Sequence, residues 1–130
     1  MRVETPRVTK ISRLTFRATV TALCEAIAAV GNTIFATIDQ SAAAEDAGLS
    51  LRPTTLIVFG NSRAGTPLME AYPLVALDLP LKLLVWEDDA LVCVAYIPMS
   101  EIAARYGVTD MDARIAAIDR TLHDLTESIV

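Results

Sequence analysis

The stretch TTLIVFGNSRAGTP, residues 54–67, contains a strand pattern, a polar loop and a helix-start signal in direct succession. TTLIVFG is apolar on both faces and rich in branched residues, which predicts a core strand. Such a strand is either covered on each side, or covered on one side and paired with a second subunit on the other. Gly60 and Gly65 then bracket the loop, and Pro67 after Thr66 predicts that a helix begins there, since the first helical N–H has no partner to lose.

This polar loop is the main candidate site. A helix N-terminus carries unpaired N–H groups and partial positive charge that accept an anion, and Arg63 would add a formal charge. A Walker A loop has the same glycine separation, but Thr66 and Pro67 stand where its lysine and hydroxyl residue belong. The loop is therefore either a structural turn or a ligand contact made by Gly60, Asn61, Arg63, Gly65 and Thr66.

Upstream of the core strand, the sequence predicts a strand, a helix, a second strand and a short helix. The first strand covers residues 8–14 near a sheet edge, and Thr15 and Gly31 begin and end the helix. The next strand, residues 32–39, is expected to have Phe35 on one face and Ile34, Ala36 and Ile38 on the other, and the alanine-rich residues 41–48 form the short helix. The longer helix has an apolar face: Phe16, Val20, Leu23, Ile27 and Val30.

Downstream, LKLLVW and LVCVAYI, joined by the acidic EDDA, predict a β-hairpin. Between the core strand and this hairpin, Pro73 and Pro80 limit the chain to short helical or irregular pieces. Pro98 opens another helix, and Thr109 with Asp112 resembles a capping box before a last helix. The apolar stripe of that last helix predicts packing on the sheet, or alternatively a helix pair between subunits: Met111, Ile115, Ile118, Leu122, Leu125 and Ile129.

This order of elements predicts one α+β domain over residues 1–130. We expect strand, helix, four strands and helix, in a mostly antiparallel sheet with helices packed on one face and short helices inserted between strands. The helical insertions on both sides of the core strand permit either parallel or antiparallel neighbours for it. In an antiparallel meander Asp39 and the hairpin at Glu87 share one end of the sheet, while residues 60–66 lie at the other. A single site that combines Asp39 with Arg63 is therefore not expected.

Composition excludes several classes of function. The net charge is −5 and the basic residues are scattered, which argues against a nucleic-acid partner. No apolar run is long enough for a membrane span, and the start MRVETPRVTKISR does not resemble a signal peptide, so we expect a cytoplasmic protein. The two cysteines, Cys24 and Cys93, are too few for a disulfide framework or thiolate metal site, and no metal or cofactor is expected.

Few other residues offer chemistry. His123, the only histidine, is expected on a solvated helix surface, so no nucleophile and base pair can be assembled and no catalytic residue is assigned. Glu87 and Asp88 could hold a cation, although acidic residues at a hairpin tip also form a charged turn. Asp39 either caps the helix that follows it or contributes to a polar site at the end of the sheet.

The run LRPTTLIVFGNSRAGTPLMEAYPLVALDLPLKLLVWEDDALVCVAY resembles domain-of-unknown-function family 302, whose hallmark is FGNPKAGTPLM followed by LDLPLK and VWED. The resemblance implies a TATA-binding-protein-like α+β fold and a dimer, but no reaction. Gln40 stands where the family commonly has histidine, Ser62 replaces a proline, Arg63 a lysine and Ala90 a turn glycine. Because glutamine does not titrate and is a poor metal ligand, the first of these changes weakens an enzymatic interpretation.

Three functional hypotheses follow. The first is a non-enzymatic, homodimeric domain that binds a small, anionic ligand at residues 60–66. The second is an interaction protein, in which the core strand and the last helix build an oligomer and the loop is only a turn. The third is an enzyme or redox protein that uses carboxylates or Cys93.

Overall fold

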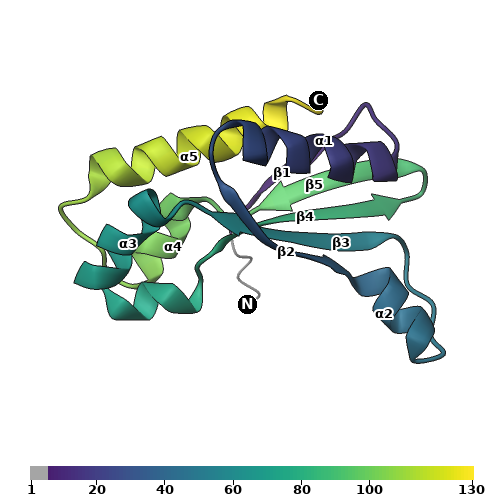
Figure 1. Ribbon diagram of the computed structural model, residues 1–130, viewed down its shortest axis with the longest axis horizontal. Coiled ribbons are helices and arrows are strands. Elements are labelled where there is room, and N and C mark those ends of the chain that lie inside the picture. The colour runs from purple at the N-terminus through teal and green to yellow at the C-terminus, as the bar shows by residue number, and fades with distance from the viewer. Residues whose placement is uncertain (1–5) are drawn as a thin grey trace.

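Five antiparallel strands form a single sheet in the computed structural model, which describes residues 6–130 (Figure 1). Their order across the sheet is β1-β5-β4-β3-β2. The core strand is β3, which pairs with β2 on one side and with β4 on the other. The predicted antiparallel α+β fold is thereby confirmed, with these strands: β1 Val8–Ile11, β2 Thr33–Asp39, β3 Thr54–Gly60, β4 Leu81–Asp88 and β5 Leu91–Tyr96.

The long helices cover only one face of this sheet. Figure 1 shows α1 and α5 over that face, α3 and α4 at one end of the sheet, and α2 beyond the other end. Within residues 6–130 no helix lies across the opposite face, and none is long and apolar enough to cross a bilayer. The helices are α1 Phe16–Ala29, α2 Gln40–Asp46, α3 Ser62–Ala71, the 3-10 helix η1 Pro73–Leu77, α4 Met99–Arg105 and α5 Asp112–Glu127.

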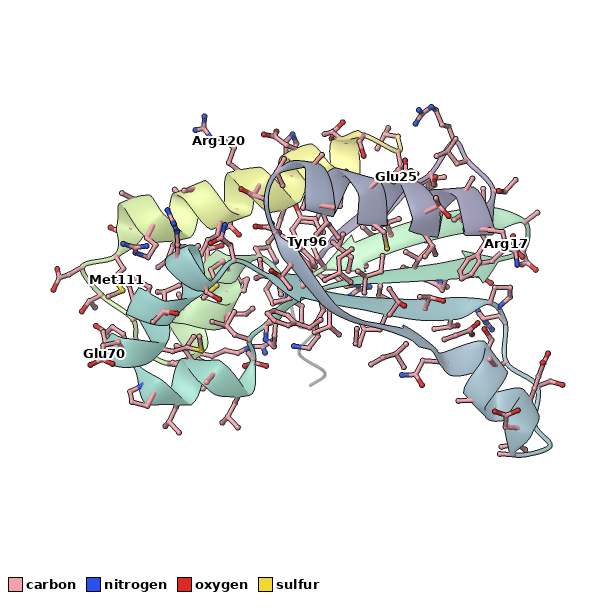
Figure 2. The ribbon with its side chains drawn as sticks, in the orientation of Figure 1. Arg17, Glu25, Glu70, Tyr96, Met111 and Arg120 are labelled. Carbon is pink, nitrogen blue, oxygen red and sulfur yellow. The ribbon has the colours of Figure 1, made fainter. Side chains whose placement is uncertain are left out.

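The hydrophobic core fills the layer between the sheet and α1 and α5. Figure 2 shows Tyr96 pointing from β5 into this layer. The apolar stripe of α5 packs in this layer, which confirms the prediction that it lies on the sheet. Its side chains are therefore buried within the chain and are not available for a helix pair between subunits. The largest fully buried side chains include Leu23, Ile27, Ile57, Phe59, Leu83, Leu122 and Ile129.

Two helix starts show how local and distant groups satisfy backbone N–H donors. Thr15 caps α1 as predicted, with its hydroxyl accepting from the Ala18 N–H at 3.2 Å. Pro98 precedes α4 but has no side-chain acceptor, and Asp119 of α5 replaces it by accepting from the Met99 and Ser100 N–H groups at 2.6 and 3.2 Å. This contact fixes α4 against α5.

The predicted end of β1 and the predicted cap of α5 are both wrong, because side chains make other hydrogen bonds at these positions. β1 ends at Ile11, since the Ser12 hydroxyl accepts from the Leu14 N–H and turns the chain. The proposed capping box before α5 does not form: Thr109 instead contacts the Tyr72 hydroxyl through its N–H, carbonyl and hydroxyl groups. The N-cap residue of α5 is Met111, which makes no side-chain cap.

The faces of β2 also differ from the prediction. A register shift between Ile34 and Ala36 places a β-bulge at Phe35. As a result Ile34 pairs with Phe59 on the covered face, whereas Ala36 pairs with Val58 on the open face. The predicted β4–β5 hairpin is confirmed, and its turn residues Asp89 and Ala90 both have positive φ, as a tight hairpin turn requires.

Candidate functional site

The polar loop is the first turn of α3, because the helix begins at Ser62 and not at Thr66 as predicted. Asn61 is the N-cap residue, and its side-chain oxygen accepts from the Arg63 N–H at 2.9 Å. Its carbonyl accepts from the Ala64 and Gly65 N–H groups at 3.0 and 2.9 Å. Asparagine is among the most favoured residues at this position because it satisfies an otherwise unpaired donor.

Pro67 lies inside α3, where a proline normally disrupts a helix. Lacking an N–H, it leaves the carbonyl of Arg63 without its helical donor. The Nη1 group of Arg114, on α5, donates to that carbonyl at 3.2 Å. A side chain from a distant helix thus replaces the missing helical hydrogen bond and ties α3 to α5.

This arrangement corrects the expectation that several loop amides are available to a ligand. The N–H groups of Arg63, Ala64 and Gly65 are all bonded to Asn61. Of the first-turn amides, only that of Ser62 has no acceptor in the described part of the chain. Backbone donors alone therefore do not make an anion site here.

A pocket of about 850 Å³ opens between α1, α3 and α5. The start of β2 and the segment before β4 complete its walls. The lining is mostly apolar with a few polar groups: Ala26, Ala29, Val30, Asn32, Phe35, Gly60, Asn61, Ser62, Ala64, Gly65, Thr66, Met69, Leu79, Pro80, Leu81, Ala113, Arg114, Ala117, Ile118, Thr121, Asp124 and Leu125. The volume falls in the range typical of small-molecule sites.

Most of the loop residues singled out in the sequence line this pocket, namely Gly60, Asn61, Gly65 and Thr66. Arg63 lies outside the lining, although it is exposed, as Arg114 is. The cation in the lining is Arg114, which sequence reasoning missed. The available signal was the row of small residues beside the apolar stripe of α5, but nothing in the sequence connected that row to the loop.

The carboxylate candidates lie at the other end of the sheet. Thr33 pairs with Gly60 whereas Asp39 pairs with Thr55, so the predicted separation of Asp39 from the loop is confirmed. Asp39 caps α2: hydrogen bonds from the Ala42 N–H and then the Ser41 hydroxyl lower the pKa of its carboxyl group.

The two hairpin residues considered for a cation site make local contacts, Asp88 through its carboxylate and Glu87 through its backbone. Asp88 forms an ion pair with Arg52 at 3.1 Å, and the Glu87 N–H donates to the Pro53 carbonyl. Across residues 6–130, no three His, Cys, Asp or Glu side chains cluster closely enough to hold a metal ion.

Cys93 and His123, two of the side chains considered for an enzymatic reaction, lie on different elements of the fold, β5 and α5. Cys93 is on the open face of the sheet, and burial is the main cause that raises the pKa of its thiol, which disfavours the reactive thiolate. His123 is exposed on α5, where its carbonyl accepts from Lys10 Nζ at 3.2 Å.

One wall of the pocket, residues 79–81, is anchored by the preceding Asp78. The carboxylate of Asp78 accepts from the Tyr106 hydroxyl at 2.5 Å and pairs with Arg105 at 3.3 Å. Tyr106 and Arg105 belong to α4 and its C-cap, so this cluster holds the end of η1 against α4. The Tyr106 bond is the largest cause of the lowered pKa of Asp78.

We expect the substitution Asp78→Asn to lower the free energy of unfolding by about 1 kcal/mol at neutral pH. Because the folded-state pKa of Asp78 is depressed, its ionic stabilisation is present above the unfolded-state pKa and is lost as pH falls through the folded-state value. Urea unfolding of both proteins from neutral to strongly acidic pH measures this difference. Asp46→Asn, an exposed aspartate on α2, is the control, and a difference that does not shrink in acid would contradict the assignment.

Comparison with known proteins identifies the family and supports the fold. The family described as "Domain of unknown function DUF302" matches residues 8–129. The crystal structure of an uncharacterized conserved DUF302 protein from Bacillus stearothermophilus superposes with a TM-score of 0.88 at 15% identity, covering 95% of this chain and 98% of that one.

Curated relatives resemble a smaller part of the chain. A protein of Brucella suis named fluoride-specific ion channel FluC 1 is 38% identical over 88 residues, which is 68% of this chain and 35% of that protein. The protein of the same name from Brucella abortus is also 38% identical over 88 residues, 33% of its length. The matched region is therefore about a third of the length of these relatives.

Proposed function

The chain belongs to the family described as domain of unknown function DUF302, and from that premise we propose that it is a homodimeric domain that binds a small molecule without catalysing a reaction. The observation that carries this proposal is the pocket between α1, α3 and α5. It combines ligand-sized volume, mostly apolar walls and a few polar groups at its edges, as binding sites for small molecules do.

The composition of the walls supports a binding role over a simple packing gap. Small side chains on two helices, Ala64 and Gly65 on α3 and Ala113 and Ala117 on α5, leave the space open. Phe35, at the bulge of β2, lines the pocket but remains 55% exposed. A ligand that covers this ring would remove its apolar surface from water, which is a favourable contribution to binding.

Binding is tested with N-phenyl-1-naphthylamine, a neutral probe whose fluorescence rises in apolar surroundings. We expect saturable binding to the wild-type chain and loss of at least about tenfold in affinity in Ala117→Trp, because the indole would fill the pocket. Ala117→Ser, which changes the same position with little added volume, is the matched control. Binding that is equal in all three proteins, or absent from the wild type, would contradict the proposal.

The dimer is proposed to form through the open face of the sheet. Side chains on this face are predominantly apolar and several are well exposed, including Ile11 at 54% and Leu91 at 51%. We propose a second copy of this chain as the partner. In an isologous contact the same patch of both chains meets, so an apolar patch can pair with itself without a separate, complementary charged surface. The apolar part of this face consists of Ile11, Ala36, Ile38, Leu56, Val58, Leu84, Trp86, Leu91, Cys93 and Ala95, and the polar residues Thr9, Thr54, Lys82 and Asp88 lie on the same face.

The size of this face also suits a second copy. Five strands about 4.8 Å apart and roughly seven residues long define a flat area on the order of 500 Å². Because side chains project from the sheet, the accessible area is larger than this flat area and approaches the roughly 800 Å² per partner of a standard interface.

A second candidate function is the handling of fluoride, favoured by the 38% identity to proteins named as fluoride-specific channels. We propose in this case that the chain binds fluoride itself. Thermal unfolding in sodium fluoride should then show a midpoint several degrees above that in sodium chloride at equal ionic strength, because binding to the folded state alone stabilises it. The same midpoint in both salts would exclude this candidate.

A further inference from the structure

We infer that the pocket takes an amphipathic monoanion: an apolar, ring-sized body with a single carboxylate or sulfonate group placed against Arg114. This inference rests on the proposed function, because it specifies which class of small molecule the same pocket binds.

The charge that recognises the anion comes from α5 and not from the loop. Arg114 is the basic residue among those that line the pocket. Arg120, on the same helix, projects away from the body of the protein in Figure 2 and is absent from the lining. The electrostatic preference of the pocket therefore depends on one identifiable side chain.

Arg114 is held in place but is not neutralised. One guanidinium nitrogen, Nη1, donates to the Arg63 carbonyl at 3.2 Å, which fixes the side chain at the α3 end of the pocket. A guanidinium has five N–H donors, so this bond leaves others for a ligand. Within the described residues no carboxylate forms an ion pair with Arg114. A planar oxyanion is the natural partner for such a group, since two parallel hydrogen bonds can form.

Nearby groups favour the same sign of charge at this end. The N-terminus of α3, capped by Asn61, directs its partial positive charge toward the same region. The Ser62 N–H has no acceptor within residues 6–130, and Asn61 and Thr66 also line the pocket. These groups supplement Arg114 and do not form a site without it.

The rest of the lining requires an apolar body on the ligand. Between its polar ends the pocket is bounded by Phe35, Met69, Leu79, Pro80 and Leu81, with alanines on the facing helices. A small inorganic anion would leave these walls without a partner. A molecule with one or two fused rings would cover them and bring its charged group to Arg114.

The opposite end of the pocket excludes a second negative charge. Asp124 lines that end and follows Arg114 by ten positions on α5, about 15 Å along the helix axis. The C-terminus of α1, with Ala26, Ala29 and Val30, also lines the pocket and adds partial negative charge. The two ends thus select a ligand with one anionic group and one orientation.

The test compares 8-anilinonaphthalene-1-sulfonate with N-phenyl-1-naphthylamine, which has the same rings without the sulfonate. We expect the sulfonate probe to bind the wild-type chain more tightly, and Arg114→Gln to weaken it roughly tenfold while changing the affinity of the neutral probe less than about twofold. Arg120→Gln makes the same change of net charge on the same helix and should leave both affinities unchanged. Retained binding of the neutral probe shows that Arg114→Gln has kept the pocket intact.

Each result separates this inference from the function on which it rests. Equal affinities for the two probes, or equal weakening by Arg114→Gln and Arg120→Gln, would overturn the anion preference while leaving the pocket as a binding site. Sulfonate binding that survives Ala117→Trp would place the probe elsewhere and also overturn the inference. Failure of the neutral probe to bind the wild-type chain would instead contradict the proposed function itself.

Discussion

Phe59→Ala is expected to lower the free energy of unfolding by about 3–5 kcal/mol, the largest effect of any substitution considered. Phe59 is 0% exposed and packs beneath α1 and α5. It belongs to β3, whose last residue, Gly60, lines the pocket. Truncation removes the burial of an aromatic ring and leaves a cavity that the surrounding side chains do not fill. Urea unfolding at one fixed protein concentration measures the change.

The matched control for this experiment is Leu74→Ala on η1. Leu74 is 66% exposed, so its truncation should alter stability by no more than about 0.5 kcal/mol. A loss below about 1 kcal/mol for Phe59→Ala would show that the core is not packed as described.

Leu84→Glu is expected to convert the proposed dimer into a monomer. Leu84 lies on the central strand β4, on the face that neither α1 nor α5 covers, and pairs with Leu56 and Ala95. In an isologous contact the two introduced carboxylates would be buried near one another, and Lys82 on the same face of β4 already donates to the Asp78 and Pro80 carbonyls. We therefore expect the dimer dissociation constant to rise at least about a hundredfold.

Sedimentation velocity at micromolar concentration distinguishes the two forms. Leu77→Glu provides a matched control, since it introduces the same charge at a leucine that is 75% exposed on η1, away from the sheet. The proposed interface would be wrong if the wild-type chain sediments as a monomer or if Leu84→Glu remains dimeric.

Periodicity predicted those parts of the fold that depend on local pattern and burial. The stripe from Ile115 to Ile129 repeats with helical spacing, and its members are buried against the sheet. The hairpin could be predicted because two apolar runs flank a short polar turn. Gly31 was identified as the end of α1, and its φ of +79° is a conformation that glycine adopts without strain.

The start of α3 could not be predicted from local sequence. Proline after Thr66 favours a helix start at that point, whereas the helix begins earlier at Ser62 with Asn61 as its cap. The structure tolerates Pro67 because Arg114, far along the chain, donates to the Arg63 carbonyl. Tertiary contacts of this kind override local preferences, and the same contact brings the missed cation to the pocket.

The bulge at Phe35 and the role of Thr109 were missed for related reasons. Strict alternation placed Ile34 and Ala36 on one face, but one additional residue in β2 reverses the faces on either side of it. Thr109 has the spacing of a capping box, but its hydroxyl and N–H groups are hydrogen-bonded to the Tyr72 hydroxyl instead. In both cases a partner from another element decided between two locally reasonable arrangements.

Backbone amide chemical shifts of isotope-labelled protein, recorded during titration with N-phenyl-1-naphthylamine, test the proposed binding function most directly. We expect the largest changes to cluster at residues 61–66 and 113–125, while Leu56 and Leu84 on the open face stay unchanged. Changes confined to the open face, or no changes at saturating probe, would contradict the proposed function.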